Sequence, residues 1–530
     1  MIFQKSLRLF HTLRHLKPIQ VFYQLKYRLV KPGTLQPVRP VAKPTPLNLP
    51  DYKPASILEV TPEKDYVFHM LNRKQVFSGQ INWGESAHGR LWNYHLQYAD
   101  FLKQENIPEN ERAVLVKDLY RSLSEGHLAL EPYPASLRIQ NMVRFLSHDA
   151  GRVDRWQDLL PFVYGEVKFL SNRLEYHLLA NHLLENAFAL LMGACFFGDR
   201  KIKTKALDLL SSQLKEQILE DGGHFERSPM YHRIVLFRVL EAISYVPKEA
   251  ALYKQLRDCA KSMISWMQAM RFRNGAMPHF NDSTHGVAPD VDTLLQMAAD
   301  LGLWGNKVVS EAPALLKESG FRKLTNHRME LIADVYGIGP SYQPGHAHAD
   351  TFSFELHVDE TPIIVDPGIS TYEKGDRRNW ERSTRAHNTV TVNGSNSSDV
   401  WASHRVGKRA EATILEDKTN SIKASHNGYQ HIGITHLRSF SLSEKSLVIE
   451  DALEGKMLPS VARFYLHPNV PVQHADTAGL ILNHSLSLSF EGASDVRVQD
   501  YQYACGFNCL EPAKVIEVKF TESLKTTISL

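Results

Sequence analysis

The chain has 530 residues, enough for two or three domains that each bury a core. Its 43% hydrophobic and 22% charged residues are ordinary for a globular protein, and no stretch offers the roughly 20 apolar residues of a membrane-spanning helix. The net charge of +3 is unevenly placed, because residues 1–50 hold nine Lys or Arg and no acidic residue. The rest of the chain is mildly acidic, which argues against a broad cationic groove for a densely sulfated polymer.

Residues 1–60 form the first predicted unit, a basic arm with a Pro-rich linker. Leu7, Phe10, Leu13 and Leu16 recur at helical spacing, so we expect one or two basic amphipathic helices. Two interpretations stay open: contact with an anionic membrane surface, or packing on the body with Lys and Arg in solvent. Charges and His interrupt the apolar run, so we expect no secretory signal and a cytoplasmic protein.

Residues 61–322 carry a mainly helical pattern and form the second predicted domain. The stretch 174–197 is apolar on most faces, as in a helix buried between others. The stretch 228–246 begins with Ser228 as a predicted N-cap and Pro229 at the first helical position. Further helices are predicted at 257–272 and 290–304.

After about residue 325 the apolar period changes from a helical one to two. The stretch 351–358 alternates, DET turns the chain and 362–368 returns, which predicts a β-hairpin. Short strands separated by turn residues continue to the C-terminus and indicate an antiparallel sandwich over 323–530. Helices first and strands second predict two separate layers.

Three polar residues interrupt the apolar stretch 174–197. His177, Asn181 and Glu185 are spaced four apart and would share a face of one helix. Polar groups on such a helix must be hydrogen-bonded or must line a cleft. The pattern therefore leaves two interpretations open: a structural hydrogen-bond network that links helices, or a site that binds a ligand.

A second polar cluster precedes and begins the helix predicted at 228–246. The stretch DGGHFERSPMYHRI brings Arg227, Tyr231 and His232 to a loop-to-helix junction, where free backbone N–H groups favour anions. A tyrosine can act as an acid or a base when a nearby cation lowers its pKa. The alternative for Tyr231 is packing at the helix start.

The third cluster opens the β-rich region with GHAHAD. In an extended segment His346 and His348 face the same side. Asp366 follows at the end of the returning strand, and His387 lies in the motif RAHNTV. Two His and one Asp suit a zinc ion with an open water position, and Asp350 is a competing ligand. The alternative is a surface His pair beside a turn aspartate.

Together these motifs resemble the heparinase II/III-like polysaccharide lyases. The resemblance rests on EYHLLANHLLENAFAL, GGHFERSPMYH, PGHAHADTFSFEL…VDPG and STRAHNTV, and it covers most of the chain beyond the arm. It implies an α+β architecture, with an incomplete α/α toroid over 61–322, an antiparallel β-sandwich over 323–530 and the active site between them. It also implies β-elimination at a uronic acid of an acidic polysaccharide, which leaves a 4,5-unsaturated uronate.

The resemblance also implies roles for individual residues. Asn181 would neutralise the substrate carboxylate, Tyr231 would act as the acid (or as the base for one C5 epimer), and His346 would act as the complementary base. A structural zinc ion would be held by His348, Asp366 and His387. As further substrate-binding candidates we name His182, Glu185, Arg227, His232 and Arg385.

Two other functions stay open at this point. In a metal-dependent glycan hydrolase, the ion at the predicted zinc site would activate water. A non-catalytic component of exopolysaccharide or capsule assembly would bind glycan without turnover. In each case the expected partner is an acidic polysaccharide, from a bacterial surface or glycosaminoglycan-like, and no nucleic acid. Reduced thiols are expected for all four cysteines, Cys195, Cys259, Cys505 and Cys509.

Overall fold

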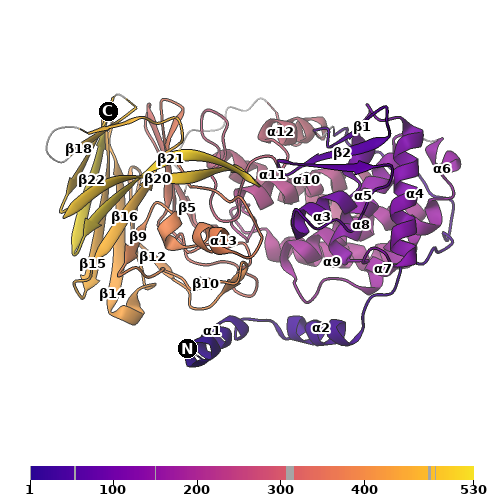
Figure 1. Cartoon of the computed structure of the whole chain (residues 1–530), viewed down its shortest axis with the longest axis horizontal. Coiled ribbons are helices and arrows are strands. Elements are labelled where there is room, and N and C mark those ends of the chain that lie inside the picture. Colours follow the sequence, from indigo (N-terminus) through magenta and orange to yellow (C-terminus); the bar gives the residue numbers. More distant parts are fainter. Residues whose placement is uncertain (1, 53–54, 150, 306–314, 475–478, 484) are drawn as a thin grey trace.

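The computed structural model describes the whole chain except residues 1, 53–54, 150, 306–314, 475–478 and 484. Figure 1 shows a helical part and a β-rich part side by side, with two N-terminal helices along one edge of both. The order of helices first and antiparallel sheets second confirms the predicted fold class. Among the described residues, no helix is both long and apolar enough to cross a membrane.

The helical domain surrounds one large apolar core. Almost every residue of helix α8 is buried in it, because Ala, Leu, Met and Phe occupy all of its faces. Helix α10 begins as predicted, with Ser228 Oγ accepting a hydrogen bond from the backbone N–H of Tyr231 (3.2 Å). The elements are α3 (Arg90–Gln97), η1 (Asp100–Lys103), α4 (Glu109–Glu125), α5 (Pro132–Ser147), α6 (Arg152–Arg155), α7 (Leu160–Asn172), α8 (Ala180–Phe197), α9 (Arg200–Gln217), α10 (Pro229–Tyr245), α11 (Ala251–Met270) and α12 (Val291–Asp300).

The expectation of a helical pattern from about residue 60 is wrong at its start. Residues 58–78 form an antiparallel three-stranded sheet, β1 (Leu58–Val60), β2 (Asp65–Met70) and β3 (Arg73–Ser78). The turn between β2 and β3 places both Leu71 and Asn72 at positive φ (51° and 57°). A two-residue hairpin turn of this kind matches the twist of its strands, and Asn tolerates it well.

Helix α8 begins six residues later than predicted. Leu179 and Ala180 have φ of 64° and 50°, which interrupts the helical path before residue 181. His177 therefore lies in the preceding loop and does not share a helical face with Asn181 and Glu185.

The C-terminal part consists mainly of three antiparallel sheets of eight, five and four strands around a common core. The predicted hairpin is confirmed as β7 and β8. The elements are β4 (Leu315–Leu316), β5 (Phe321–Thr325), β6 (Met329–Asp334), β7 (Phe354–Val358), β8 (Thr361–Ile364), α13 (Asp376–Glu381), η2 (Thr384–Ala386), β9 (Val390–Val392), β10 (Val400–Trp401), β11 (Arg405–Val406), β12 (Ala412–Lys418), β13 (Ser421–His426), η3 (Gln430–Ile432), β14 (Ile434–Leu442), β15 (Ser446–Gly455), β16 (Ser460–Tyr465), β17 (Val472–His474), β18 (Gly479–Leu482), β19 (Leu486–Glu491), β20 (Asp495–Gly506), β21 (Cys509–Phe520) and β22 (Ser523–Ser529).

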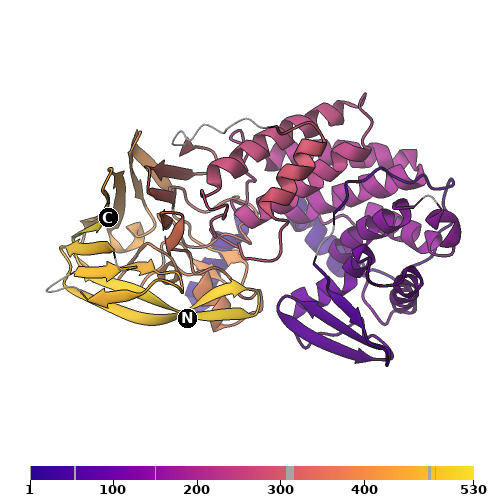
Figure 2. The ribbon, with the colours of Figure 1, turned by 90° about the horizontal axis from the view of Figure 1, so that it is seen from above.

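The prediction of four reduced cysteines is wrong for one pair. Cys505 and Cys509 form a disulfide across the turn of the β20–β21 hairpin, whose two strands bring the thiols together, while Cys195 and Cys259 are free. The tip of this hairpin reaches the helical domain, as Figure 2 also shows from above. Asn72 Nδ2 donates to the Phe507 carbonyl (3.0 Å), and Asn508 Nδ2 donates to the Leu71 carbonyl (2.9 Å).

Candidate active site

The centre of the candidate site is the carboxylate of Asp282, in the loop between α11 and α12. It is fully buried and accepts two hydrogen bonds from the Arg378 guanidinium of α13, at 2.5 and 2.7 Å. It also pairs with His346 Nδ1 and His348 Nε2, each at 2.8 Å. Burial opposes ionisation, but Arg378 and the two histidines outweigh it and hold the pKa of Asp282 well below its usual value.

The two histidines of GHAHAD therefore meet at one group, although not for the predicted reason. Residues 345–350 form turns and a bend before β7, so strand alternation does not align His346 and His348. Asp282 draws them together instead, and its backbone N–H also donates to the His346 carbonyl (3.0 Å).

Tyr231 lies directly beside His346 at the junction of the two domains. Their ring centroids are 4.1 Å apart, and the Tyr231 hydroxyl is 3.2 Å from the hydroxyl of Tyr372, which lies in the loop between β8 and α13. Burial, and then the neighbouring Tyr372, raise the pKa of the Tyr231 phenol well above its usual value. The phenol is therefore protonated at neutral pH, which is the form that a general acid needs.

Asn181 stands in the first turn of α8 and is held by Glu226. Its side-chain Nδ2 lies 3.0 and 2.9 Å from the two Glu226 carboxylate oxygens, and its backbone N–H donates to Glu226 Oε1 (3.1 Å). Glu226 thus satisfies one of the free N–H groups of the helix N-terminus. The loop before Glu226 turns at Gly222 (φ 87°), where a Cβ would lie 2.1 Å from the Ser262 carbonyl oxygen.

His182, the next residue of α8, is partly exposed. Its Nδ1 lies 3.2 Å from Glu175 Oε1, and its ring centroid is 4.5 Å from that of Tyr133. Desolvation opposes protonation, but the Glu175 carboxylate outweighs it and raises the pKa of the imidazole. The start of α8 therefore presents a polarised histidine next to Asn181.

Two of the other predicted substrate-binding residues are engaged in buried structural contacts. Glu185 accepts from Gln140 Nε2 (2.5 Å) and pairs with Arg238 (2.9 Å). His232 is stacked on Trp266 and bonded to the Met263 carbonyl (3.0 Å), and burial lowers its pKa to about 3. These partners place both residues in the packing of the helical domain.

The remaining two predicted substrate-binding residues are arginines, and no hydrogen bond of either guanidinium to the Asp282 cluster is found among the described residues. The Arg227 guanidinium stacks 3.5 Å over the Tyr336 ring and donates to the Glu318 carbonyl (3.1 Å). Arg385 is exposed on the η2 turn, where its carbonyl, not its guanidinium, accepts a hydrogen bond from Tyr465.

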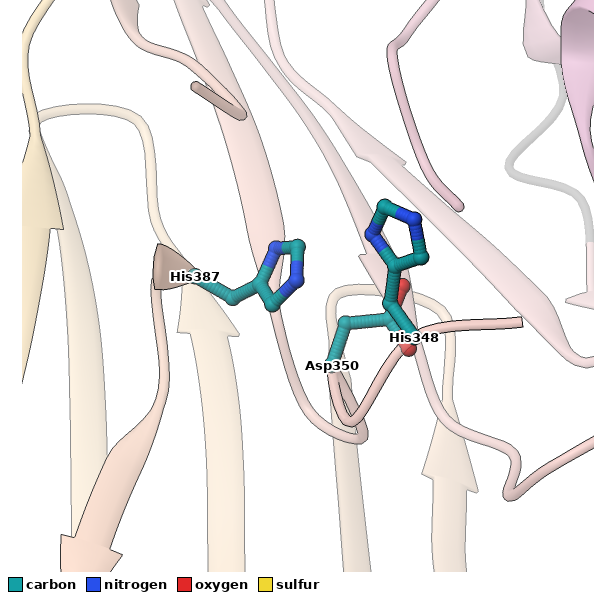
Figure 3. Close-up of side chains that lie close together, drawn as sticks. All are labelled: His348, Asp350 and His387. Atoms are coloured by element: carbon teal, nitrogen blue, oxygen red, sulfur yellow. The ribbon is translucent and has the colours of Figure 1, made fainter. Parts of the chain in front are cut away.

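A second cluster, shown in Figure 3, consists of His348, Asp350 and His387. One ligand atom each of His348, Asp350 and His387 lies within 4.8 Å of the others, and all three residues are buried. His348 Nδ1, His387 Nε2 and Asp350 Oδ2 have no hydrogen-bond partner among the described residues. Three buried, unpartnered donor atoms of N and O type fit a zinc-like ion.

Asp366 has a different place from the predicted one. Its Oδ2 pairs with His387 Nδ1 at 2.8 Å, so the cluster of facing atoms contains Asp350 where we expected Asp366. Each histidine thus has one nitrogen on a carboxylate (His348 on Asp282, His387 on Asp366) and the other free. Metal-binding histidines are commonly oriented by such outer carboxylates.

Comparisons with known proteins agree with this architecture. The family model "Heparinase II/III N-terminus" matches residues 81–301, and "Heparinase II/III-like, C-terminal" matches residues 309–530. The chain belongs to the heparinase II/III family. Among solved structures, this heparinase II/III-family chain resembles the crystal structure of heparinase III with a TM-score of 0.69 and 16% identity, over 85% of this chain and 79% of that one. This likeness confirms the fold.

Curated relatives of this heparinase II/III-family chain include two heparin-sulfate lyases. The protein from Bacteroides stercoris is 23% identical over 76% of this chain and 63% of its own length. The protein from Pedobacter heparinus is 24% identical over 70% of this chain and 57% of its own length. The matches thus span less than two thirds of either relative.

Proposed function

We propose that this protein is a polysaccharide lyase that cleaves a uronic-acid-containing polysaccharide by β-elimination. The observation that carries the proposal is the pair of Tyr231 and His346, with 4.1 Å between their ring centroids, in a chain of the heparinase II/III family. Asn181, held by Glu226 at the start of α8, completes the proposed catalytic set. The names of the two relatives, which are heparin-sulfate lyases, support the same reaction class.

In the proposed reaction His346 removes the C5 proton of the uronate. Because Nδ1 lies on Asp282, the ring proton belongs on that nitrogen, which leaves a lone pair on Nε2 to take the proton. The C5–H electrons form the C4–C5 double bond as the C4–O bond breaks. Tyr231 donates its phenolic proton to the departing oxygen. The Tyr372 hydroxyl, 3.2 Å from that of Tyr231, can then donate a hydrogen bond to the phenolate that remains.

The substrate carboxylate has to be neutralised before the C5 proton becomes acidic enough to leave. We assign this task to Asn181 together with His182, at the N-terminal turn of α8. The raised pKa of His182 favours its positively charged form, and the helix N-terminus favours an anion. Glu226 fixes the amide of Asn181 through both carboxylate oxygens.

For the substrate we propose a sparsely charged bacterial surface polysaccharide or exopolysaccharide. Outside the basic arm the chain is mildly acidic, which suits a polymer with few charges better than a densely sulfated one. A glycosaminoglycan-like polymer carries the same uronate chemistry and belongs in the test.

We propose that His348, Asp350 and His387 hold a zinc-like ion, with Asp366 and Asp282 as outer partners. When bound, such an ion would tie the turn before β7 to the motif around His387 and so support the loop that carries His346. The elimination described above leaves no step for a Lewis acid, so the proposed role is structural.

The decisive experiment is incubation of the purified protein with a panel of uronate polysaccharides. Ultraviolet absorbance follows the unsaturated product, and mass spectrometry follows product mass. A rise in absorbance without added water in the product is the expected result. Cleavage that adds water to the product and gives no rise in absorbance would show instead that the protein is a hydrolase, with the metal cluster as the group that activates water. Saturable binding of one glycan without any product would point to an assembly role.

A further inference from the structure

The two N-terminal helices expose many of their large apolar side chains, whereas a helix packed on a protein body usually buries them. These are α1 (Ile2–Leu13) and α2 (Pro18–Leu29), and each contacts the body of the protein through polar groups. In α1, Arg8 pairs with Asp399 (2.8 Å) and Thr12 accepts from the Trp401 indole (3.2 Å). These two contacts fix α1 on the β-rich domain.

Helix α2 is fixed on the helical domain in the same way. The Lys17 ammonium before it pairs with Glu216, the buried Gln20 donates to the Leu178 carbonyl (3.3 Å), and the Tyr27 hydroxyl donates to the Leu174 carbonyl (2.8 Å). Polar contacts thus attach both helices, and in α2 the Tyr23 ring also packs on Tyr176, with 4.8 Å between ring centroids. This orientation leaves Phe22, Leu25 and Leu29 exposed.

Large apolar side chains are gathered on the outer faces of both helices. Nine of the seventeen large hydrophobic residues that are exposed in the described part of the chain lie between Leu9 and Val30. Phe10 is 61% exposed, Phe22 60%, Leu25 56% and Leu29 85%. Single exposed apolar residues are ordinary, but such a concentration in one short stretch of the chain marks an interaction surface.

The same surface is cationic and has no acidic residue. Lys26 and Arg28 are exposed on α2, Arg14 and Lys31 are exposed just after the two helices, and residues 1–50 contain no Asp or Glu. Leu25 and Leu29 share a helical face with Phe22, and Lys26 and Arg28 flank that face. An apolar stripe of Phe and Leu bordered by Lys and Arg is the pattern of helices that lie in a membrane interface.

We propose that this surface, formed by the outer faces of α1 and α2, docks flat on an anionic phospholipid bilayer. Both helices run along one edge of the molecule, across the two domains (Figure 1), so they present a common outer edge to a membrane. The positive charge without a compensating negative one favours anionic lipid over an electrically mixed protein surface. This inference does not depend on the reaction proposed above.

The test is co-flotation of the full-length protein with vesicles. Vesicles of phosphatidylcholine with about a third phosphatidylglycerol are compared with vesicles of phosphatidylcholine alone. We expect binding at least tenfold tighter to the anionic vesicles, weakened by salt. The substitution of Phe22, Leu25 and Leu29 together by Ser should weaken it at least tenfold without lowering the midpoint of thermal unfolding.

A matched control replaces exposed apolar residues elsewhere, Leu415→Ser with Leu510→Ser (52% and 44% exposed), and should bind like the wild type. A second variant, Lys26→Gln with Arg28→Gln, should lose the preference for anionic lipid. Wild-type protein that stays in solution with both kinds of vesicle overturns the proposal. So does a concentration-dependent dimer that the triple Ser variant abolishes, because the surface would then belong to a second copy of this chain.

Discussion

His346 Nδ1 and Asp282 Oδ2 lie 2.8 Å apart, although 64 residues separate them in the chain. The pair fixes which imidazole nitrogen carries the proton and leaves the other nitrogen as an acceptor beside Tyr231. Asp282 is itself held by the forked Arg378 guanidinium, so the orientation of His346 depends on an ion pair between the loop after α11 and α13.

Asp282→Asn should therefore lower kcat by about 100-fold or more with little change in KM, because the general base loses its orientation. The variant also leaves Arg378 buried without its anion, at a cost of about 3–5 kcal/mol in the free energy of unfolding. Assays and thermal melts on the same samples would separate the two effects.

Asp451→Asn is the matched control for that variant. Asp451 is buried and is bonded by Arg438 and His436 as Asp282 is by Arg378 and His346, but inside the β-rich domain. The Asp451→Asn variant should lose about as much free energy of unfolding as Asp282→Asn, but its kcat should equal that of the wild type at temperatures where the variant is folded. Equal loss of kcat in both variants would show that Asp282 acts only through the fold.

Tyr231→Phe should abolish the appearance of unsaturated product, with a loss of about 100- to 10,000-fold, because the proton donor is removed. The fold should survive, since one partly exposed hydrogen bond to Tyr372 is worth about 1 kcal/mol. Tyr372→Phe should cost roughly tenfold, the effect of one supporting hydrogen bond. A wild-type rate for Tyr231→Phe would remove Tyr231 from the mechanism.

Glu226→Gln should raise KM and lower kcat, because Gln places an amide group against the Asn181 amide and turns it from its present orientation. Each parameter should change by about tenfold, the worth of one charge-assisted hydrogen bond. Glu185→Gln provides the comparison: it breaks the pair with Arg238, and should lower the unfolding midpoint while KM stays the same. Identical kinetics for both variants would argue against a positioning role for Glu226.

Removal of metal should lower stability before it lowers activity. If His348, Asp350 and His387 hold an ion at a hundredfold excess over its Kd, its removal costs on the order of 3 kcal/mol. Elemental analysis of the purified protein, thermal melts with and without chelator, and the variant His387→Ala check this. Immediate loss of activity at unchanged stability would give the ion a part in the reaction.

The helix α9 provides a pH-dependent contribution far from the site. Asp199 caps its N-terminus, accepting from Ile202 N–H (3.0 Å), the Tyr164 hydroxyl (2.7 Å) and Lys168 (2.6 Å). Burial opposes ionisation, but Lys168 and these hydrogen bonds lower the pKa of Asp199 to about 2, below the unfolded value near 4. The ionised carboxylate therefore stabilises the fold above pH 4, by on the order of 2 kcal/mol, and this is lost as pH falls toward 2.

Asp199→Asn should consequently be less stable than wild type at pH 7, and the difference should shrink between about pH 4 and 2. Urea unfolding at several pH values measures it. A difference that is constant across this range would mean that the capping hydrogen bonds, and not the charge, provide the stability.

Local signals predicted the parts of the fold that local chemistry determines. The N-cap at Ser228 and the β7–β8 hairpin both follow from a few neighbouring residues. The sheet at 58–78 was missed because its strands are short and stand at the edge of a helical domain. The late start of α8 depends on Leu179 and Ala180, whose positive φ no sequence pattern announces.

The site was predicted where one motif holds the residue, and missed where the partner is distant in sequence. Asp282 and Arg378 meet across 96 positions, and nothing in the sequence around either marks them as a pair. Glu226 stands in the stretch DGGHFERSPMYHRI, but nothing in that stretch marks it as the partner of Asn181. Asn181 and Glu185 look equivalent by spacing, yet one meets Glu226 near the site and the other an arginine inside the helical domain. Spacing shows which residues share a face, not what that face meets.

The contact between the β2–β3 turn and the tip of the β20–β21 hairpin joins residues 435 positions apart. Phe507 at that tip also lies against the ring of Tyr372, 4.9 Å between centroids, next to Tyr231. The N-terminal helices connect the same two domains elsewhere, because α1 contacts the β-rich domain and α2 contacts the helical domain. The two domains, which separate family models match, can consequently not be exchanged independently of each other. A chimera that joins one domain of this chain to the other domain of a relative would have to keep both sets of contacts, those of the hairpin tip and those of the N-terminal helices. Without them, Tyr231 of one domain and His346 of the other would not be held in their present arrangement.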